Sequence, residues 1–299
     1  MKVASWNVNS VRTRIDNILE WIKKENPDIL CLQEIKVVTE SFPREPFEDL
    51  GYNLIINGQK SYNGVATLSK FLIEESITKI PNFDDDQARY IETVHSVNSK
   101  VIRISNIYLP NGNPYPGDKF DYKLNWMKAL KAHLNSLHIK DESFILLGDF
   151  NVIPENIDAY DADKWLNDAL FTIETRKEFR EIISLGLNDM YRAYNPLAKD
   201  FTFWDYQRGA WQKNEGIRID HILASPIACL LYTSDAADDF TSVDLSDKEL
   251  EKRRKKWKPR ETDYNSGTLW KYSQTVGSAQ NGAITHPGAD EETHCYADI

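Results

Sequence analysis

Cysteine and histidine are scarce in this sequence of 299 residues, which has three cysteines and six histidines. Cys31, Cys229 and Cys295 show neither metal-like nor paired spacing. Neither a zinc site nor a disulfide framework is therefore expected. The simplest interpretation is a protein of the reducing cytoplasm.

Long apolar runs are also missing. The start of the chain, MKVASWNVNS, has no apolar stretch long enough for a signal peptide. No segment approaches the ~18 apolar residues that would span a bilayer. A Walker loop, a dinucleotide fingerprint and a Gly-x-Ser-x-Gly elbow are absent, so three common catalytic schemes find no support.

Positive charge is in short supply, because 36 Lys and Arg face 46 Asp and Glu and the net charge is −10. Lys and Arg usually drive phosphate binding, so this balance argues mildly against a nucleic-acid partner. The objection is weak, because a protein that binds a divalent metal at its active site carries acidic residues for that purpose.

Periodic segments fill the first three quarters of the chain. Alternating and continuous apolar patterns predict strands, and 3.6-residue apolar spacing predicts helices. Some strands follow each other without a helix, which favours a mixed-sheet α/β sandwich over a purely doubly wound sheet. The expected strands are 2–8, 28–34, 64–70, 88–97, 101–110, 143–150 and 217–225, and the expected helices are 11–27, 118–138 and 174–186.

Polar residues mark one end of five of these strands. In α/β folds, ligands bind at the carboxyl ends of strands, so the five could converge on one site. Asn and Asp also start turns and cap helices, and for any one of these positions alone that interpretation is preferred. Five in series favour a shared site. They are Trp6-Asn7, Gln33-Glu34, Asn106 to Tyr108, Asp149 to Asn151, and Arg218 to Asp220.

The chemistry of this set is oxygen-based. Carboxylates and carboxamides without a Cys or His cluster suit Mg²⁺ or Mn²⁺ and not zinc. Such an ion neutralises charge on a phosphate while a carboxylate aligns water. Asp149 and Asn151, two residues apart on an extended chain, would face the same side. The set therefore indicates phosphodiester or phosphomonoester hydrolysis.

Six ordered blocks closely resemble the exonuclease III family of the endonuclease/exonuclease/phosphatase superfamily. They run from Met1 to about Ala228. The resemblance implies a four-layered α/β sandwich of two packed mixed sheets flanked by helices, of the deoxyribonuclease I-like kind. The blocks are SWNVNSVRTR, PDILCLQEIK, GYNLIINGQKSYNGVATLSK, NIYLPNGN, LLGDFNVIPENIDAYD and GIRIDHILASP.

The resemblance also implies an activity and a cofactor. The family cleaves duplex DNA 5′ to abasic sites and acts as a 3′-to-5′ exonuclease and 3′-phosphatase. It implies Mg²⁺, with Mn²⁺ as an alternative, and a monomer that acts on abasic sites or 3′ ends of duplex DNA in the cytoplasm. A superfamily phosphatase acting on non-nucleic phosphoesters is the alternative within the same fold.

Carried over residue by residue, Asn7 and Glu34 match the metal site. Tyr108 matches the phenol that contacts the scissile phosphate. Asp149 matches the carboxylate that activates or orients the attacking water, and Asn151 the amide that steadies it. The residues expected to contact DNA are Lys36, Arg89, Asn111, Trp204, Arg208 and Trp211.

The family's last motif is not recognisable. Asp220 matches the acid whose family role is to hold a catalytic histidine in a final Ser-Asp-His-Ala-Pro-like segment. Ser234 and Asp235 are followed by Ala236 and not by a histidine, and Asp235 lies only 15 residues after Asp220, too near for another strand and loop. We therefore interpret this partial match as a coincidence. We therefore expect a nuclease domain over residues 1–228 whose last strand is missing, and whose turnover is in question.

The end of the chain resembles a different family. Residues 241–299 are similar to the C-terminal end of dihydroxy-acid dehydratase, without that family's cluster-binding cysteines. Ser246 and Glu249 form a capping-box pattern and Pro259 would end the helix, so one short helix is expected. The hypothesis is therefore a fusion joined at residues 229–240. The alternative to an active nuclease is a catalytically impaired fusion product that at most binds DNA.

Overall fold

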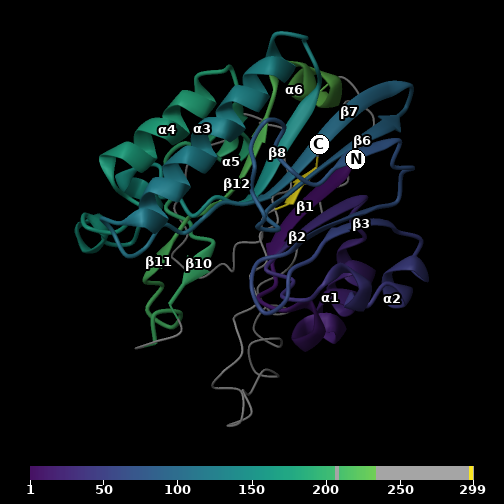
Figure 1. The fold of residues 1–299 in the computed structure, drawn as a ribbon, viewed down its shortest axis with the longest axis horizontal. Coiled ribbons are helices and arrows are strands. Elements are labelled where there is room, and N and C mark those ends of the chain that lie inside the picture. The colour runs from purple at the N-terminus through teal and green to yellow at the C-terminus, as the bar shows by residue number, and fades with distance from the viewer. Residues whose placement is uncertain (206–208, 234–295, 299) are drawn as a thin grey trace, which may run out of the picture.

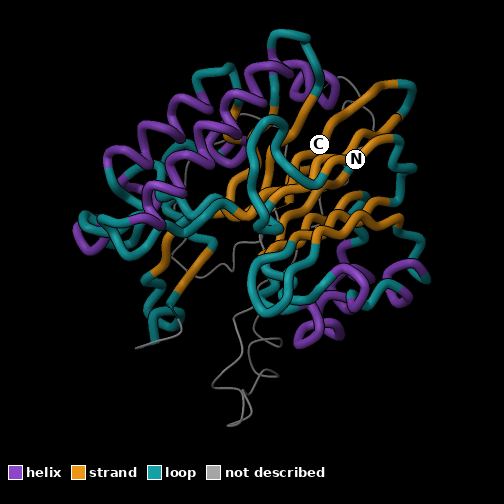
Figure 2. The backbone as a smooth tube through the Cα atoms, in the orientation of Figure 1, coloured by secondary structure: helices purple, strands orange, loops and turns teal. Residues whose placement is uncertain are grey.

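Two mixed β-sheets lie between two layers of helices in the computed structural model, which describes residues 1–205, 209–233 and 296–298. Helices α1 and α2 cover one outer face and α3 and α4 cover the other, as Figures 1 and 2 show. The predicted four-layered arrangement is confirmed. The helices are α1 (Val11–Glu25), α2 (Glu45–Glu48), α3 (Asp118–His138), α4 (Ile173–Ile183), α5 (Met190–Tyr194) and α6 (Pro226–Thr233).

The first sheet has the order β13-β1-β2-β4-β3. β1 and β2 are parallel, and α1 connects them across the outer face. Helix α1 packs Val11, Ile18 and Trp21 against the sheet and ends where Asn26 takes a left-handed conformation. The strands are β1 (Lys2–Asn7), β2 (Ile29–Gln33), β3 (Asn53–Asn57), β4 (Val65–Ser69) and β13 (Tyr296–Asp298).

The second sheet has the order β5-β6-β7-β8-β12-β9. β7 and β8 are parallel, while β12 runs antiparallel to β8. Every residue of β8 is buried, as expected for a strand covered on both faces. The strands are β5 (Glu75–Ile77), β6 (Tyr90–Val97), β7 (Lys100–Tyr108), β8 (Phe144–Asp149), β9 (Asn188–Asp189) and β12 (Asp220–Ala224), and a hairpin of β10 (Phe203–Trp204) and β11 (Gly216–Ile217) stands apart.

The core between the sheets is aliphatic. Val3, Ile29, Ile145 and Leu147 belong to one buried cluster that joins the two sheets. Burial of such side chains contributes roughly 1.5–3 kcal/mol each, so this layer is a main source of stability. It also fixes how the strand ends of one sheet face those of the other.

The edge of the first sheet at β1 differs from expectation. We expected the last strand to be missing, but β13 pairs antiparallel with β1 over Lys2, Val3 and Ala4. An uncovered edge would leave a row of backbone N–H and C=O groups without partners. Three residues from the far end of the chain supply part of that pairing. The helix expected at Ser246 to Pro259 lies outside the described residues.

Helix α3 buries an unexpected residue. Lys123 is fully buried beside Trp126, whereas the adjacent Leu124 is only half-buried. One lysine of α3 therefore points into the protein.

Among the helices that the structure describes, none combines the length and the apolar character of a membrane-spanning segment.

Candidate active site

The register of the second sheet lines up three of the predicted catalytic residues. Tyr108 is paired with Asp149 across β7 and β8, and Asp149 with Asp220 across β8 and β12. Asp220 opens its strand, although the sequence pattern placed it inside one. Because β12 is antiparallel, its first residue lies at the same edge of the sheet as the last residues of β7 and β8.

Gly148 permits the close approach of β7 to β8 just before Asp149. Its φ is +142°, and a Cβ there would lie 2.0 Å from the carbonyl oxygen of Ile107. A side chain would thus push apart the two strands that carry Tyr108 and Asp149. The strand pairing therefore requires the glycine that follows the four apolar residues of β8.

The first sheet supplies the other half of the site. Asn7, the last residue of β1, donates from Nδ2 to Glu34 Oε1 and to Asp149 Oδ2, both at 2.9 Å. The Tyr108 hydroxyl donates to the same Glu34 oxygen at 3.0 Å. The amide of Asn7 therefore connects a carboxylate at the end of one sheet to a carboxylate at the end of the other.

A buried pair of amides joins the sheets just behind this link. Gln33 Nε2 donates to Asn106 Oδ1 at 2.8 Å, and Asn106 Nδ2 donates to the carbonyl oxygen of Ala66 at 2.9 Å. Both side chains are fully buried. A buried amide that lost its partners would be costly, so the pair specifies the alignment of the two sheets. Both residues are among the polar strand ends of the sequence, from which no role was predicted for them.

Asn151 lies two residues after the end of β8 and has a left-handed backbone with φ +47°. Its backbone N–H donates to Asp149 Oδ1 at 2.9 Å, and its Nδ2 donates to the carbonyl oxygen of Leu109 at 2.9 Å. Asn111 Nδ2 in turn donates to Asn151 Oδ1 at 3.1 Å. The predicted catalytic amide is thus held next to the carboxylate it was expected to steady.

The carboxylates of the site have unequal pKa values. Burial raises the pKa of Asp149 to about 7, against hydrogen bonds from Asn7 and Asn151, and the charge of Glu34 adds to the rise. Burial and the nearby Asp149 raise the pKa of Asp220 well above its ordinary value. For Glu34, burial is outweighed by hydrogen bonds from Asn7 and Lys36 and by the Lys36 charge, which lower its pKa. Crowded acids of this kind indicate a site for a cation or a proton.

The donor set fits a hard divalent ion. No three His, Cys, Asp or Glu side chains converge as a metal-ligand cluster within the described residues. Glu34 and Asp149 are connected by the Asn7 amide, and the Lys36 ammonium, 2.8 Å from Glu34 Oε2, offsets only one charge. One or two carboxylates completed by waters and phosphate oxygens are what Mg²⁺ normally takes. The set does not fit zinc.

Three of the residues expected to contact DNA border this centre. Lys36 pairs with Glu34, and Asn111 bonds to Asn151. The guanidinium of Arg89 lies 4.8 Å from the centre of the Tyr108 ring and donates to the Tyr108 carbonyl oxygen at 3.1 Å. Arg89 therefore orients the strand end that carries the phenol.

The other three belong to the segment around the β10–β11 hairpin. Trp204 is buried, and Trp211 is 44% exposed with its ring centre 4.9 Å from that of Trp204. Trp204 Nε1 donates to Asn214 Oδ1 at 3.0 Å. One indole thus anchors the hairpin while the other reaches solvent. Arg208 lies outside the described residues.

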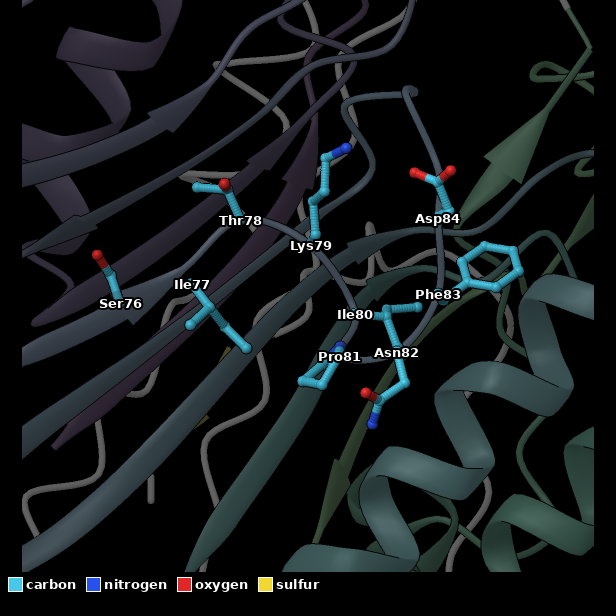
Figure 3. A pocket seen from close by; sticks show the side chains of 9 residues that line it. All are labelled: Ser76, Ile77, Thr78, Lys79, Ile80, Pro81, Asn82, Phe83 and Asp84. Atoms are coloured by element: carbon cyan, nitrogen blue, oxygen red, sulfur yellow. The ribbon is translucent and has the colours of Figure 1, made fainter.

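A surface hollow of about 670 Å³ lies elsewhere, along the loop after β5 (Figure 3). Its lining residues, 76–84, include only Lys79 and Asp84 as charged side chains. None of the predicted site residues lines it. The hollow offers no cluster of acids, so the strand ends remain the candidate active site.

Known proteins match most of the chain. A model of the Endonuclease/Exonuclease/phosphatase family matches residues 4–247. Exodeoxyribonuclease III of Haemophilus influenzae is 34% identical over 234 residues, spanning 75% of this chain and 88% of that protein. The solved AP endonuclease of Archaeoglobus fulgidus has a TM-score of 0.71 and 34% identity, covering 76% of this chain and 87% of that one.

A structure of the 3′ phosphatase NExo from Neisseria, bound to a product DNA hairpin, has a TM-score of 0.73 and 35% identity, covering 76% of this chain and 87% of that one. The predicted resemblance of a short segment to dihydroxy-acid dehydratase is also confirmed. Dihydroxy-acid dehydratase 2 of Mesorhizobium japonicum is 63% identical over 65 residues, which are 22% of this chain and 11% of that protein.

Proposed function

Because the chain belongs to the Endonuclease/Exonuclease/phosphatase family and is a DNA repair nuclease of the exodeoxyribonuclease III type, we propose that it hydrolyses duplex DNA with Mg²⁺. The substrates are abasic sites and 3′ ends. The family depends on a divalent metal, and Mn²⁺ is the alternative ion. The proposed setting is a monomer in the cytoplasm.

The observation that supports this proposal most directly is the amide of Asn7. It bonds to Glu34 and Asp149, which come from different sheets, at 2.9 Å each. Two carboxylates from different sheets that bond to one amide repel each other when both are ionised, which destabilises the fold. A bound cation and a phosphate would give those charges a function.

Each residue has a distinct part in the proposed hydrolysis. Glu34 and Asn7 would hold the ion, which supplies charge neutralisation on the scissile phosphate. Asp149 in its ionised form would orient the attacking water and accept its proton. Asn151 holds Asp149 through its backbone N–H and would direct its amide at a phosphate oxygen. Tyr108, whose pKa is raised above its ordinary value by burial and then by Glu34, keeps its proton and would donate a hydrogen bond.

The alternative is a chain that binds DNA without turnover. It is favoured by the missing motif, because no recognisable Ser-Asp-His-Ala-Pro-like segment follows Ser225. Loss of a general acid or base typically lowers the rate ~10²–10⁴-fold. Under this alternative, the site at Asp149 would still take a metal ion and duplex DNA.

We also propose that residues 1–228 form the nuclease domain, that 229–240 are a junction, and that 241–299 are a foreign tail without dehydratase activity. The short dehydratase likeness supports this division, because only 11% of that protein is matched. The join could be an artefact of sequence assembly, and amplifying the gene across codons 225 to 250 from source DNA tests this. A continuous native product with this sequence would show that the join is not an artefact.

The deciding experiment is incision of a labelled duplex that has one abasic site, with Mg²⁺ and with EDTA, alongside an undamaged duplex. Metal-dependent incision 5′ to the site would support the proposed function. Binding of the duplex without incision would support the impaired chain. Release of phosphate from a sugar phosphate but not from DNA would point to a superfamily phosphatase and contradict both.

A further inference from the structure

A fully buried lysine lies beneath the candidate active site. Lys123 comes from α3, and its side chain has no exposed surface. Burial lowers its pKa to about 7, while Asp168 and Asp149 favour its charged form. A buried ammonium is costly unless its donors are all used, so its retention requires specific partners.

The partners are three backbone carbonyl oxygens from three different loops. Lys123 Nζ donates to Asn111 at 3.1 Å, to Asn151 at 2.7 Å and to Ala169 at 3.1 Å. These loops follow β7, follow β8 and precede α4. An ammonium has three protons, and here each one holds a separate segment of chain.

Two of the three loops carry side chains of the site. Asn111 and Asn151 are bonded to each other through their amides, and Asn151 also bonds to Asp149. Asn151 has a left-handed backbone, which costs energy for a residue with a side chain and persists only where its surroundings hold it. The bond from Lys123 to its carbonyl oxygen is one of those restraints.

The lysine stem is also enclosed. Gly112 has φ +91°, and a Cβ there would lie 2.7 Å from Lys123 Cδ and 3.1 Å from the Cβ of Ala169. The absence of a side chain at this position lets the β7–α3 loop close over the lysine. The ammonium is therefore fixed by its stem as well as by its hydrogen bonds.

We propose that Lys123 is a positioning residue of this nuclease: its ammonium holds the loops after β7 and β8 so that Asn111 and Asn151 present their amides beside Asp149. The expected effect on catalysis rests on the proposed function, whereas the restraint of the two loops by Lys123 does not depend on it. A lysine that only filled the core would affect all parts of the fold alike.

The test is Lys123→Met, which keeps most of the stem volume and removes the donors. The matched control is Lys131→Met on the same helix, whose ammonium pairs with Glu178 at 2.9 Å and with Glu181, both on α4. Hydrogen exchange by mass spectrometry compares peptides from residues 109–113 and 150–153 with peptides from β2 and β8. The labelled abasic duplex with Mg²⁺ gives kcat and KM for the same proteins.

We expect Lys123→Met to speed exchange in the two loops about tenfold and to leave the strand peptides unchanged, because only local opening becomes easier. We expect kcat to fall about 10²-fold, as for a displacement of roughly 1 Å at catalytic groups, with KM within about twofold. Lys131→Met should change neither measurement in these loops.

Uniformly faster exchange in every peptide, or loops that exchange as in the unaltered protein, would overturn the proposal. If the unaltered protein does not incise DNA, the proposed function fails, and the exchange data still decide the role of Lys123. If Lys123→Met does not fold, Lys123→Gln is measured in the same way. Failure of both to fold would mean that the lysine serves the core, and the positioning role would be wrong.

Discussion

At the scale of single residues, the site depends on which groups are charged. Asp149 is buried between Asn7, Asn151 and Glu34, and these contacts act on its pKa in opposite directions. Hydrogen bonds to the ionised form favour it, while burial and the neighbouring acid oppose it. The carboxylate can therefore exchange a proton near neutral pH, which the proposed activation of water would require.

Asp149→Asn removes the carboxylate and keeps the shape of the side chain. We expect incision of the abasic duplex to fall ~10²–10⁴-fold, because an amide cannot accept the proton of water. Asp49→Asn on an exposed position is the control and should leave the rate unchanged. Undiminished incision by Asp149→Asn would place the chemistry elsewhere.

His221 predicts a pH dependence of stability. Burial, and then the charge of Arg218, lowers its pKa from 6.5 to about 4. Nε2 bonds to the carbonyl oxygen of Val152 at 3.0 Å. Between these two pKa values the unfolded chain binds more protons than the folded one, so stability falls as pH decreases from 6.5 to 4. The loss is about 1.4 kcal/mol for each unit of difference in pKa.

Urea unfolding at pH 7 and pH 4.5 measures this effect. His221→Gln should lose less stability between the two values than the unaltered protein, because glutamine does not titrate. His138→Gln, on an exposed position at the end of α3, should follow the unaltered protein. Equal losses in all three proteins would show that carboxyl groups alone account for acid destabilisation.

At the scale of elements, the parallel pairing of β7 and β8 sets the distance between Tyr108 and Asp149. At Gly148 the two strands lie so close together that there is no room for a Cβ. The pairing therefore depends on one residue type, and the strand end would change shape with any other.

Gly148→Ala should destabilise the fold and reduce incision together, because the added Cβ would lie 2.0 Å from the Ile107 carbonyl oxygen. Gly51→Ala is a matched control, since Gly51 has φ +84° and nothing within 4 Å of an added Cβ. We expect Gly51→Ala to cost ~1 kcal/mol and Gly148→Ala about 2 kcal/mol more in urea unfolding. Similar costs would mean that backbone strain and not the clash dominates.

At the scale of the whole molecule, two sheets contribute to the edge at which we propose that the metal ion binds. Glu34 follows a strand of the first sheet and Asp149 ends a strand of the second. An ion that binds the folded chain at this edge stabilises it, because the unfolded chain keeps no such site.

Mg²⁺ should therefore raise the melting temperature progressively as its concentration exceeds its dissociation constant, and EDTA should reverse the increase. Glu34→Gln should abolish most of the increase. Glu48→Gln, on an exposed residue of α2 paired with Arg44, should retain it. An equal increase in melting temperature for both variants, measured by differential scanning calorimetry, would show that Glu34 does not bind the ion.

The sequence alone determined the three longest helices and most of the strands, although not β3, as well as the polar strand ends and the oxygen character of the site, because apolar periodicity and residue type are local properties. It led to Asn7, Glu34, Tyr108, Asp149 and Asn151, which the fold brings together. The resemblance indicated their separate roles, which remain predictions.

Only the tertiary structure decided which groups touch. The antiparallel course of β12 put its first residue, Asp220, at the edge of the sheet that carries Asp149, and the packing of α3 buried Lys123 and left Leu124 half-buried. The three carbonyl partners of Lys123 lie 12, 28 and 46 residues away along the chain. No local pattern encodes contacts of that range, because they form only when two sheets and a helix pack together.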